Sequence, residues 1–388
     1  MAGERFLPYG RQAIDESDIK AVVDALTSDH LTTGPAVETF ERELAAATQS
    51  RFTVSVCNGT AALHAACFAA GVGPGDEVIV PAITFLATAN CARYLEAEPK
   101  FADVDPDTGL ILPSEVERLA NAKTRAVLPV HLTGAAADVE SIGELARKVG
   151  ATVIEDAAHA LGGRDTKAPI GACASSDMTI FSFHPVKQIT TGEGGAISCN
   201  RDELRDRMAK FRSHGMTREP AEFQTPSPGP WYYEQHILGF NYRLTDIQAA
   251  LGSSQLRKLS AFVARRRALA ARYDTRLVEL PAVRPVTRGD AAPGSAYHLY
   301  SVLIDFDAVG IDRAELMGRL RERGIGTQVH YIPVPMQPYY RARGWDPNDF
   351  PGAMSYYRRT LSLPLFPAMA DGDVDRVVDA LAASLGAR

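Results

Sequence analysis

Cysteine is scarce in this chain, and the few cysteines do not form pairs. They are five in number, an odd count, and they are scattered along 388 residues. Disulfide frameworks and zinc sites both need closer and more regular spacing. The pattern therefore predicts reduced core residues and no metal site. The five are Cys57, Cys67, Cys91, Cys173 and Cys199.

Long apolar runs and basic clusters are also missing. No run reaches the roughly 18 apolar residues that a membrane helix needs, and the opening MAGERFLPYG has no apolar signal core. The net charge is -6, and neither a basic run nor a helix-turn-helix pattern occurs. We therefore expect a cytoplasmic protein that binds neither membranes nor nucleic acid.

Internal repeats and low-complexity segments are absent, and what remains is a regular alternation of short strands and helices. Beginning at residue 52, short apolar runs alternate with segments of helical period. This order predicts an α/β fold whose mostly parallel sheet is covered on both faces and binds its ligand at the carboxyl ends of the strands. The expected strands are residues 53–57, 77–81, 100–104, 125–132, 152–155, 178–183 and 196–199.

A change of composition near residue 255 indicates a second domain. We expect a large domain at 1–255, with an extended N-terminal arm, and a small α+β domain at 256–388 with strands at 297–304 and 327–331. Residues 216–233 hold several prolines and aromatics and are long for a passive connection, so we expect a flap over the site.

The stretch 177–200, DMTIFSFHPVKQITTGEGGAISCN, carries the first candidate for chemistry. A strand stops at His184 and Pro185, because proline removes a backbone donor and restricts its neighbour. Lys187 follows at once, and small residues around it let a ligand approach the backbone. A lysine on such a turn suits a Schiff-base nucleophile. From this stretch alone, a plain surface lysine is an equal alternative.

Asp156 is the second candidate. It ends a nearly continuous apolar strand and is followed by Ala157 and Ala158 instead of solvent-facing residues. A carboxylate in such surroundings is costly without a cationic partner. A protonated pyridine nitrogen is one possible partner, and a salt bridge to arginine or lysine is the structural alternative.

A third feature is the polar turn Asn58, Gly59 and Thr60, which joins a strand to an alanine-rich helix. Such a turn presents free backbone N–H groups and the positive end of a helix to an anion, so it is a possible phosphate seat. The same arrangement also begins many helices of ordinary βαβ units.

Five motifs in this order resemble the DegT/DnrJ type of nucleotide-sugar aminotransferase, whose members are pyridoxal-phosphate enzymes of fold type I. The resemblance extends from the LTTGP turn at 31–35 to VHYIPV at 329–334. It implies a large domain with a mostly parallel seven-stranded sheet, pyridoxal 5′-phosphate as cofactor, with a pyridoxamine 5′-phosphate form, and a homodimer. The motifs are NGTAAL at 58–63, ITFLATAN at 83–90, EDAAHALG at 155–162, SFHPVKQITTGEGGA at 182–196 and GFNYRLTDIQAALG at 239–252.

The resemblance also implies roles for single residues. Lys187 would form the Schiff base with the cofactor and Asp156 would pair with its pyridine nitrogen. The phosphate would be held by Ser182 with Gly59 and Thr60, and by an asparagine of the partner subunit that matches Asn241. Phe85 would stack on the ring, with a core aromatic as the alternative, and His159 would lie near the phenolic oxygen. Five further residues would either face the substrate or have only a structural role: Thr32, Thr33, Glu193, Arg243 and His330.

The reaction that this resemblance implies has two halves. L-glutamate would leave its amino group on the cofactor, and a keto sugar nucleotide would then receive it. SFHPVK followed by ITTGEGG is more similar to members that act at C4 of 6-deoxy sugars, and QVHYIP at 328–333 is most similar to those of pseudaminic acid biosynthesis. We therefore expect a UDP-4-keto-6-deoxy-N-acetylhexosamine as substrate.

Three other functions stay open at this stage. The first is a C4 aminotransferase for another UDP- or dTDP-linked 4-keto-6-deoxy sugar. The second is a dehydratase of the same fold, which has histidine in place of the lysine; Lys187 argues against it. The third is a regulator that binds pyridoxal phosphate without turnover, which the acidic balance and the absence of a DNA-binding segment disfavour.

Overall fold

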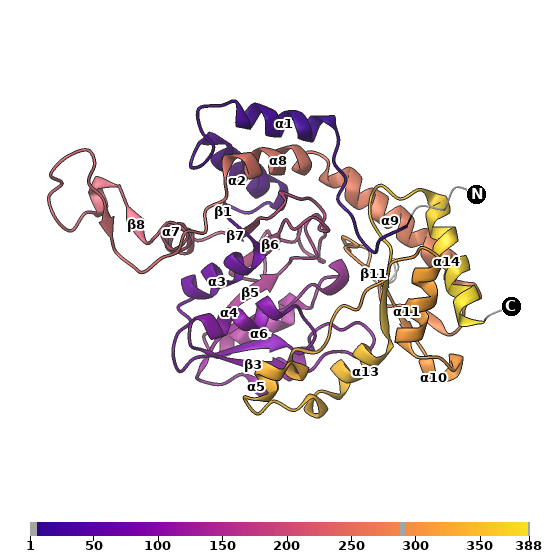
Figure 1. Ribbon diagram of the computed structural model, residues 1–388. Helices are drawn as coiled ribbons and strands as arrows, with labels where there is room; N and C mark the ends of the chain where they lie inside the picture. Colours follow the sequence, from indigo (N-terminus) through magenta and orange to yellow (C-terminus); the bar gives the residue numbers. More distant parts are fainter. Residues whose placement is uncertain (1–5, 288–291, 387–388) are drawn as a thin grey trace.

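A seven-stranded sheet forms the centre of the computed structural model, which describes residues 6–287 and 292–386 (Figure 1). The strand order is β1-β7-β6-β5-β4-β2-β3, and β7 alone runs antiparallel to its neighbours. The predicted mostly parallel seven-stranded sheet is therefore confirmed. Its strands are β1 Phe52–Val56, β2 Glu77–Pro81, β3 Glu98–Ala102, β4 Thr124–Val127, β5 Thr152–Asp156, β6 Met178–Ser182 and β7 Gly195–Cys199.

Helices cover both faces of this sheet, because alternate residues of each strand point to opposite sides. In β2, Val78 and Val80 pack with α3 and α4, whereas Ile79 packs with α5 and α6 on the other face. The alternation of side chains along each strand therefore gives the sheet two apolar faces, each covered by helices, as the α/β class requires. These helices are α3 Gly59–Ala69, α4 Leu86–Tyr94, α5 Pro113–Leu119, α6 Val139–Lys148 and α7 Asp202–Phe211.

Two expected strands of the large sheet differ from the observed ones by two residues or more, and the strand expected at 297–304 begins only at Tyr300. The strand expected at 125–132 ends at Val127, because Pro129 has no N–H to donate and the chain beyond it makes only single contacts with β5. The strand expected at 100–104 begins two residues earlier, at Glu98, and the chain leaves the sheet after Ala102.

Three helices pack together beside β1, and a fourth leads from them to the C-terminal part of the chain. α1 Glu16–Leu26 and α2 Pro35–Thr48 both pack against α8 Asp246–Leu256 (Figure 1). Capping boxes begin two of them, at Asp15 for α1 and at Thr245 for α8. α9 Leu259–Arg276 then runs toward the C-terminal elements.

A small antiparallel sheet organises the C-terminal part, in the order β10-β11-β12. The strand expected at 327–331 is wrong: that segment makes only a bridge from Gln328 to Ser362, and β12 fills the place instead. The proposed boundary near residue 255 stays a prediction, although α9 shares its apolar core with this sheet. The elements are β10 Val283–Pro285, β11 Tyr300–Ile304, β12 Thr360–Leu363, α10 Phe306–Val309, α11 Arg313–Glu322, α12 Pro338–Arg341, α13 Pro351–Arg359 and α14 Asp371–Leu385.

The hairpin formed by β8 Met216–Thr217 and β9 Glu234–Gln235 projects from the body (Figure 1). The expected flap over the site of its own chain is therefore wrong. Its residues instead contact one another, through hydrogen bonds to Glu234 and a ring contact between Phe223 and Tyr232. Among the residues that the structure describes, five short 3₁₀ turns complete the fold, at Leu132–Gly134, Pro220–Glu222, Leu277–Glu279, Val334–Met336 and Pro347–Asp349.

Within the described residues, no helix has both the length and the apolar character that crossing a bilayer requires. The same residues contain no group of three or more histidine, cysteine, aspartate or glutamate side chains placed to hold a metal ion.

Candidate active site

A cavity of about 660 Å³ lies where β1, β2, β5 and β6 end, between the sheet and the segment 328–337. This is the edge at which parallel α/β sheets bind ligands, because the loops that follow neighbouring strands meet there. The predicted residues that line it are Gly59, Thr60, Phe85, Asp156, His159, Ser182, Lys187, Glu193 and His330.

Lys187 enters the cavity from a tight turn after β6. The backbone N–H of Lys187 donates to the carbonyl of His184 at 2.9 Å, and the Thr191 N–H and Thr190 hydroxyl both donate to the carbonyl of Phe183 at 3.0 Å. Its amine makes no hydrogen bond or ion pair with any other described residue. Burial lowers the pKa of Lys187 to about 8, against the opposing effect of Asp156. About a tenth of the amine is therefore uncharged and nucleophilic at pH 7, a far larger share than for an ordinary lysine.

Asp156 lies at the end of β5 with 5% of its surface exposed. One carboxylate oxygen accepts from the Thr88 hydroxyl at 2.7 Å, and the other accepts from the Ala158 N–H at 3.1 Å. No arginine or lysine of the described chain forms an ion pair with it. The structural alternative, a salt bridge within the described chain, is thus not observed. The buried carboxylate is therefore available to pair with a cationic group of a ligand in the cavity.

The turn before α3 opens into the same cavity. Asn58 caps the helix by accepting from the Ala61 N–H at 2.8 Å, which leaves the first N–H groups of α3 facing the cavity. At Gly59 a Cβ atom would lie 3.0 Å from the Cβ of Ser182, so a side chain would crowd the opening. Small residues here let an anion approach the backbone.

Histidine and tyrosine side chains form the wall opposite the sheet. His159 Nε2 lies 3.0 Å from the Tyr331 hydroxyl, and its ring lies 4.3 Å from that of His298. His330 contacts Ser362 through Nδ1 at 2.8 Å. Burial, with Lys187 nearby, lowers the pKa of His159 and brings the pKa of His330 to about 3, so both rings are neutral at physiological pH.

Phe85 begins α4 at the rim of the cavity and is 57% exposed. Its ring lies 5.9 Å from that of Tyr331. An aromatic ring left this open is not part of the apolar core, so the alternative that treats Phe85 as a core residue does not hold. A flat ligand in the cavity would cover it.

Four predicted residues lie outside the cavity of their own chain. Thr32 forms a bridge with Thr245 and Thr33 takes a left-handed backbone conformation with φ of 57°, both on the exposed turn before α2. Asn241 is exposed and Arg243 is partly buried, after the projecting hairpin. His131, a further histidine near the end of β4, is fully buried and contacts Glu155 at 2.7 Å.

Sequence reasoning missed several lining residues. Thr88, Tyr331 and His298 come from three separate segments, and Tyr9 comes from the N-terminal arm, which was expected only to be polar and extended. The VHYIPV motif could have pointed to Tyr331. Nothing in the sequence around Tyr9 marks it, because its position depends on contacts with residues more than 300 positions away.

These features fit pyridoxal 5′-phosphate. The cavity offers an amine of lowered pKa for its aldehyde, a buried carboxylate for its ring nitrogen, a helix N-terminus for its phosphate and an exposed ring for its face. All four lie in one cavity, although they come from four separate strand ends.

Solved structures of sugar aminotransferases have the same fold. The chain matches the apo form of Spr1654 from Streptococcus pneumoniae, assigned as a sugar aminotransferase, with a TM-score of 0.91 and 29% identity over 98% of each chain. Spr1654 has also been solved in PLP and PMP forms. PseC from Helicobacter pylori, an aminotransferase involved in the biosynthesis of pseudaminic acid, matches with a TM-score of 0.91 and 29% identity over 99% of this chain and all of PseC. The class of protein is therefore a PLP-dependent sugar aminotransferase.

The family is equally plain. The DegT/DnrJ/EryC1/StrS aminotransferase family model matches residues 12–382, and the chain belongs to that family. Among characterised sequences it is similar to the spore coat polysaccharide biosynthesis protein SpsC of Bacillus subtilis (strain 168), with 41% identity over 379 residues, 97% of this chain and 96% of SpsC. The resemblance inferred from the five motifs is confirmed, and so are the fold class and the cofactor.

Proposed function

We propose that this enzyme transfers the amino group of L-glutamate to C4 of a UDP-4-keto-6-deoxy-N-acetylhexosamine and so forms UDP-4-amino-4,6-dideoxy-N-acetyl-β-L-altrosamine, an intermediate of pseudaminic acid biosynthesis. The observation that carries the chemistry is the pair Lys187 and Asp156 in one cavity, the first with a lowered pKa and the second without a cationic partner among the described residues. The likeness to PseC and the motifs around Lys187 support the choice of sugar.

Lys187 has two tasks in this proposal. Its amine would hold the cofactor covalently, and when free it would act as the base that takes up and returns the proton at the reacting carbon. Asp156 would stabilise a positive charge on the ring nitrogen, and Thr88 and the Ala158 N–H fix the direction of its carboxylate. When bound, pyridoxal phosphate supplies the electron sink that the reaction needs.

The remaining cavity residues bind and orient. Gly59, Thr60 and Ser182 hold the phosphate, Phe85 covers one face of the ring, and His159, kept neutral and held by Tyr331, contacts the phenolic oxygen. Glu193 and His330 line the same cavity and contact substrate.

A homodimer completes the site. L-glutamate carries two carboxylates, yet among the described residues that line the cavity Lys187 is the only lysine or arginine. Asn241 and Arg243 lie outside the cavity of their own chain, so we assign them to the partner's cavity, where Asn241 contacts the phosphate and Arg243 a carboxylate. Thr32 and Thr33 approach the partner's substrate from the same edge. An exposed apolar stripe on α1 suits such an interface; it consists of Ile19, Val23 and Leu26.

A second candidate keeps the reaction and changes the sugar. The 41% identity with SpsC, a polysaccharide biosynthesis protein, exceeds the 29% identity with PseC. Another UDP- or dTDP-linked 4-keto-6-deoxy sugar is therefore the alternative substrate, because loops that contact the sugar diverge faster than the cofactor site.

The test separates the two halves of the reaction. We expect the yellow purified enzyme to lose its colour with L-glutamate alone and to regain it with the UDP-4-keto-6-deoxy-N-acetylhexosamine. The sugar is identified with a panel of UDP- and dTDP-4-keto sugars. Mass spectrometry gives the mass of each product, and NMR gives its configuration. Preference for another member of the panel would replace the first candidate by the second.

A Lys187→Ala variant tests the assignment of the lysine. We expect it to lose the absorbance of the lysine-bound cofactor and at least about 10³-fold in turnover, because it removes both nucleophile and base. Lys167→Ala, at an exposed lysine paired with Glu140, is the matched control and should behave as wild type. Turnover by Lys187→Ala near the wild-type rate would refute the proposal.

A further inference from the structure

The N-terminal arm is attached to the C-terminal part of the molecule next to the cavity. Leu7 donates to the Gly324 carbonyl and accepts from the Gly326 N–H, both at 2.8 Å, in a parallel bridge centred on Ile325. The Tyr9 carbonyl accepts from the Leu365 N–H at 3.0 Å. The backbone of the arm is therefore fixed on both sides of Pro8.

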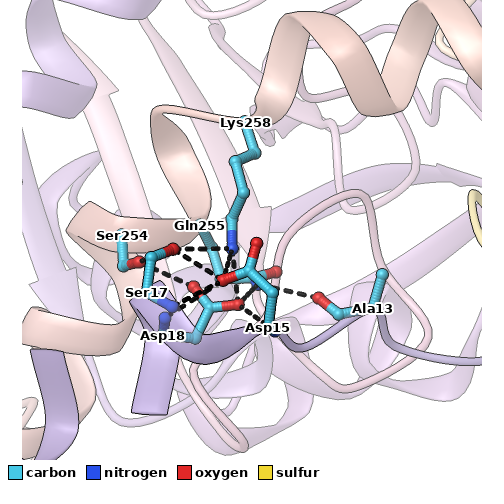
Figure 2. A network of polar contacts seen from close by, with 7 residues as sticks. All are labelled: Ala13, Asp15, Ser17, Asp18, Ser254, Gln255 and Lys258. Carbon is cyan, nitrogen blue, oxygen red and sulfur yellow. Dashed lines mark hydrogen bonds and ion pairs between the residues drawn. The ribbon is translucent and has the colours of Figure 1, made fainter. Parts of the chain in front are cut away.

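A second attachment holds the arm where α1 begins (Figure 2). The carboxylate of Asp18 is fully buried and accepts from the Ser254 hydroxyl at 2.7 Å, the Gln255 amide at 2.7 Å and the Lys258 amine at 2.6 Å. The same Gln255 amide donates to the Ala13 carbonyl at 2.9 Å. Because a buried charge is costly without its partners, this network holds α1 firmly to α8 and to the residues before α9.

Between the two attachments the arm passes directly over the lysine turn. At Gly10 a Cβ atom would lie 3.4 Å from the Cβ of Val186, the residue before Lys187. Tyr9 lines the large cavity, and its ring centre lies 5.4 Å from that of His330. The arm thus carries one aromatic side chain into the space above Lys187.

The phenol of Tyr9 has no hydrogen-bond partner among the described residues. Burial raises the pKa of Tyr9, so its hydroxyl stays protonated and can donate as well as accept. A neutral group of this kind suits the hydroxyls and the amide of an N-acetyl sugar. It supplies no positive charge for the two carboxylates of glutamate, which bind cationic groups more strongly than neutral donors.

We propose that Tyr9 is a substrate-positioning residue for the nucleotide sugar, which hydrogen-bonds a hydroxyl or amide group of the sugar and turns its keto carbon toward Lys187. This inference rests on the proposed function and adds a residue to its acceptor half. Asp18 and Lys258 touch no substrate; they act through the arm, by fixing where Tyr9 stands.

The test uses the holoenzyme and follows the two half-reactions separately by stopped-flow absorbance. For Tyr9→Phe we expect KM for the UDP-4-keto-6-deoxy-N-acetylhexosamine, or for the panel sugar that is turned over best, to rise about 3- to 10-fold, the worth of one hydrogen bond. Conversion by L-glutamate should stay within about twofold of wild type. Tyr339→Phe is the matched control, because Tyr339 is 54% exposed and does not line the cavity.

A second variant tests the attachment of the arm. Lys258→Gln keeps Tyr9 but weakens the network, so we expect the same rise in KM for the sugar, together with faster amide hydrogen exchange at residues 9–13. An unchanged KM in Tyr9→Phe would overturn the proposal, and so would an equal slowing of both half-reactions. Failure of wild-type enzyme to react with L-glutamate would instead contradict the proposed function itself.

Discussion

Burial and hydrogen bonding act differently on Lys187 and Asp156, although both side chains line the same cavity. Among the described residues the amine has no partner, and burial lowers its pKa, whereas the carboxylate is held by the Thr88 hydroxyl and the Ala158 N–H. Burial of an amine favours its neutral form. The same cavity therefore prepares a nucleophile at one point and fixes the direction of a carboxylate at another.

The pKa of Lys187 predicts the pH dependence of cofactor capture. We expect apoenzyme to react with pyridoxal 5′-phosphate at a rate that rises with pH and levels off above about 8, instead of continuing toward the ordinary lysine value of 10.5. Between these two values the unfolded chain binds more protons than the folded one, so the apoenzyme should also gain stability as the pH rises. Stopped-flow absorbance and thermal melts across pH 7 to 11 measure the two effects. A rate still climbing at pH 10 would contradict the assigned pKa.

Asp156→Asn should separate cofactor capture from catalysis. An amide cannot balance a positive ring nitrogen, so we expect the variant to bind the cofactor through Lys187 but to react with L-glutamate at least about 10²-fold more slowly. Thr88→Val, which removes one hydrogen bond from Asp156, should lose only about 10-fold. Single-turnover rates with glutamate are the measurement, and a rate within threefold of wild type for Asp156→Asn would exclude the role.

At the scale of elements, the site depends on where strands end. β5 delivers Asp156 and β6 delivers Ser182, and the turn after β6 delivers Lys187 within a few residues. Because these strands are parallel neighbours in the sheet, their carboxyl ends lie at one edge. The helix α3 adds its N-terminus at the same edge, since it follows β1 at once.

The projecting hairpin is ordered by a single carboxylate. Glu234 accepts from the Gln224 N–H at 2.7 Å, the Thr225 N–H at 3.0 Å and the Tyr232 hydroxyl at 3.0 Å, and it contacts His236 at 2.8 Å. These bonds, led by the Gln224 N–H, lower the pKa of Glu234 to about 2. The stabilisation is therefore fully present above the ordinary value of 4.5 and is lost as the pH falls through about 2.

Glu234→Gln should loosen this hairpin without unfolding the protein. A glutamine retains only one acceptor oxygen and places an NH₂ among donors, so we expect faster amide exchange across 216–238 and a melting temperature within about 2 °C of wild type. Glu219→Gln, at an exposed glutamate of the same hairpin, is the control and should leave exchange unchanged. Exchange mass spectrometry decides, and equal exchange in both variants would contradict the role of Glu234.

At the scale of the whole molecule, the prediction concerns the assembly of the site. If Asn241 serves the partner's cavity, a Lys187→Ala chain and an Asn241→Ala chain each lack a different half of the site. Mixed dimers then contain one intact site, and an equal mixture should recover about a quarter of the wild-type activity. Activity after co-refolding, compared with the two variants assayed separately, is the measurement. No recovery in verified mixed dimers would mean that each chain builds its site alone.

The sequence by itself determined the α/β class, the order of strands and helices, the family and the cofactor. It did so because strand and helix periods, proline and glycine positions, and the short motifs around Lys187 and Asp156 act over a few residues. The same local reasoning placed the turn at Asn58 between a strand and a helix, where the structure has it.

The tertiary structure alone decided what local patterns do not contain. It paired β12 with β11, where a strand at 327–331 was expected, left the hairpin outside the lining of the cavity, and brought Tyr9, His298 and Tyr331 together around Lys187. These outcomes depend on contacts between residues hundreds of positions apart, such as those of Leu7 with Gly324 and of Asp18 with Lys258. Such contacts arise from the packing of the whole chain, and no segment carries the information for them on its own.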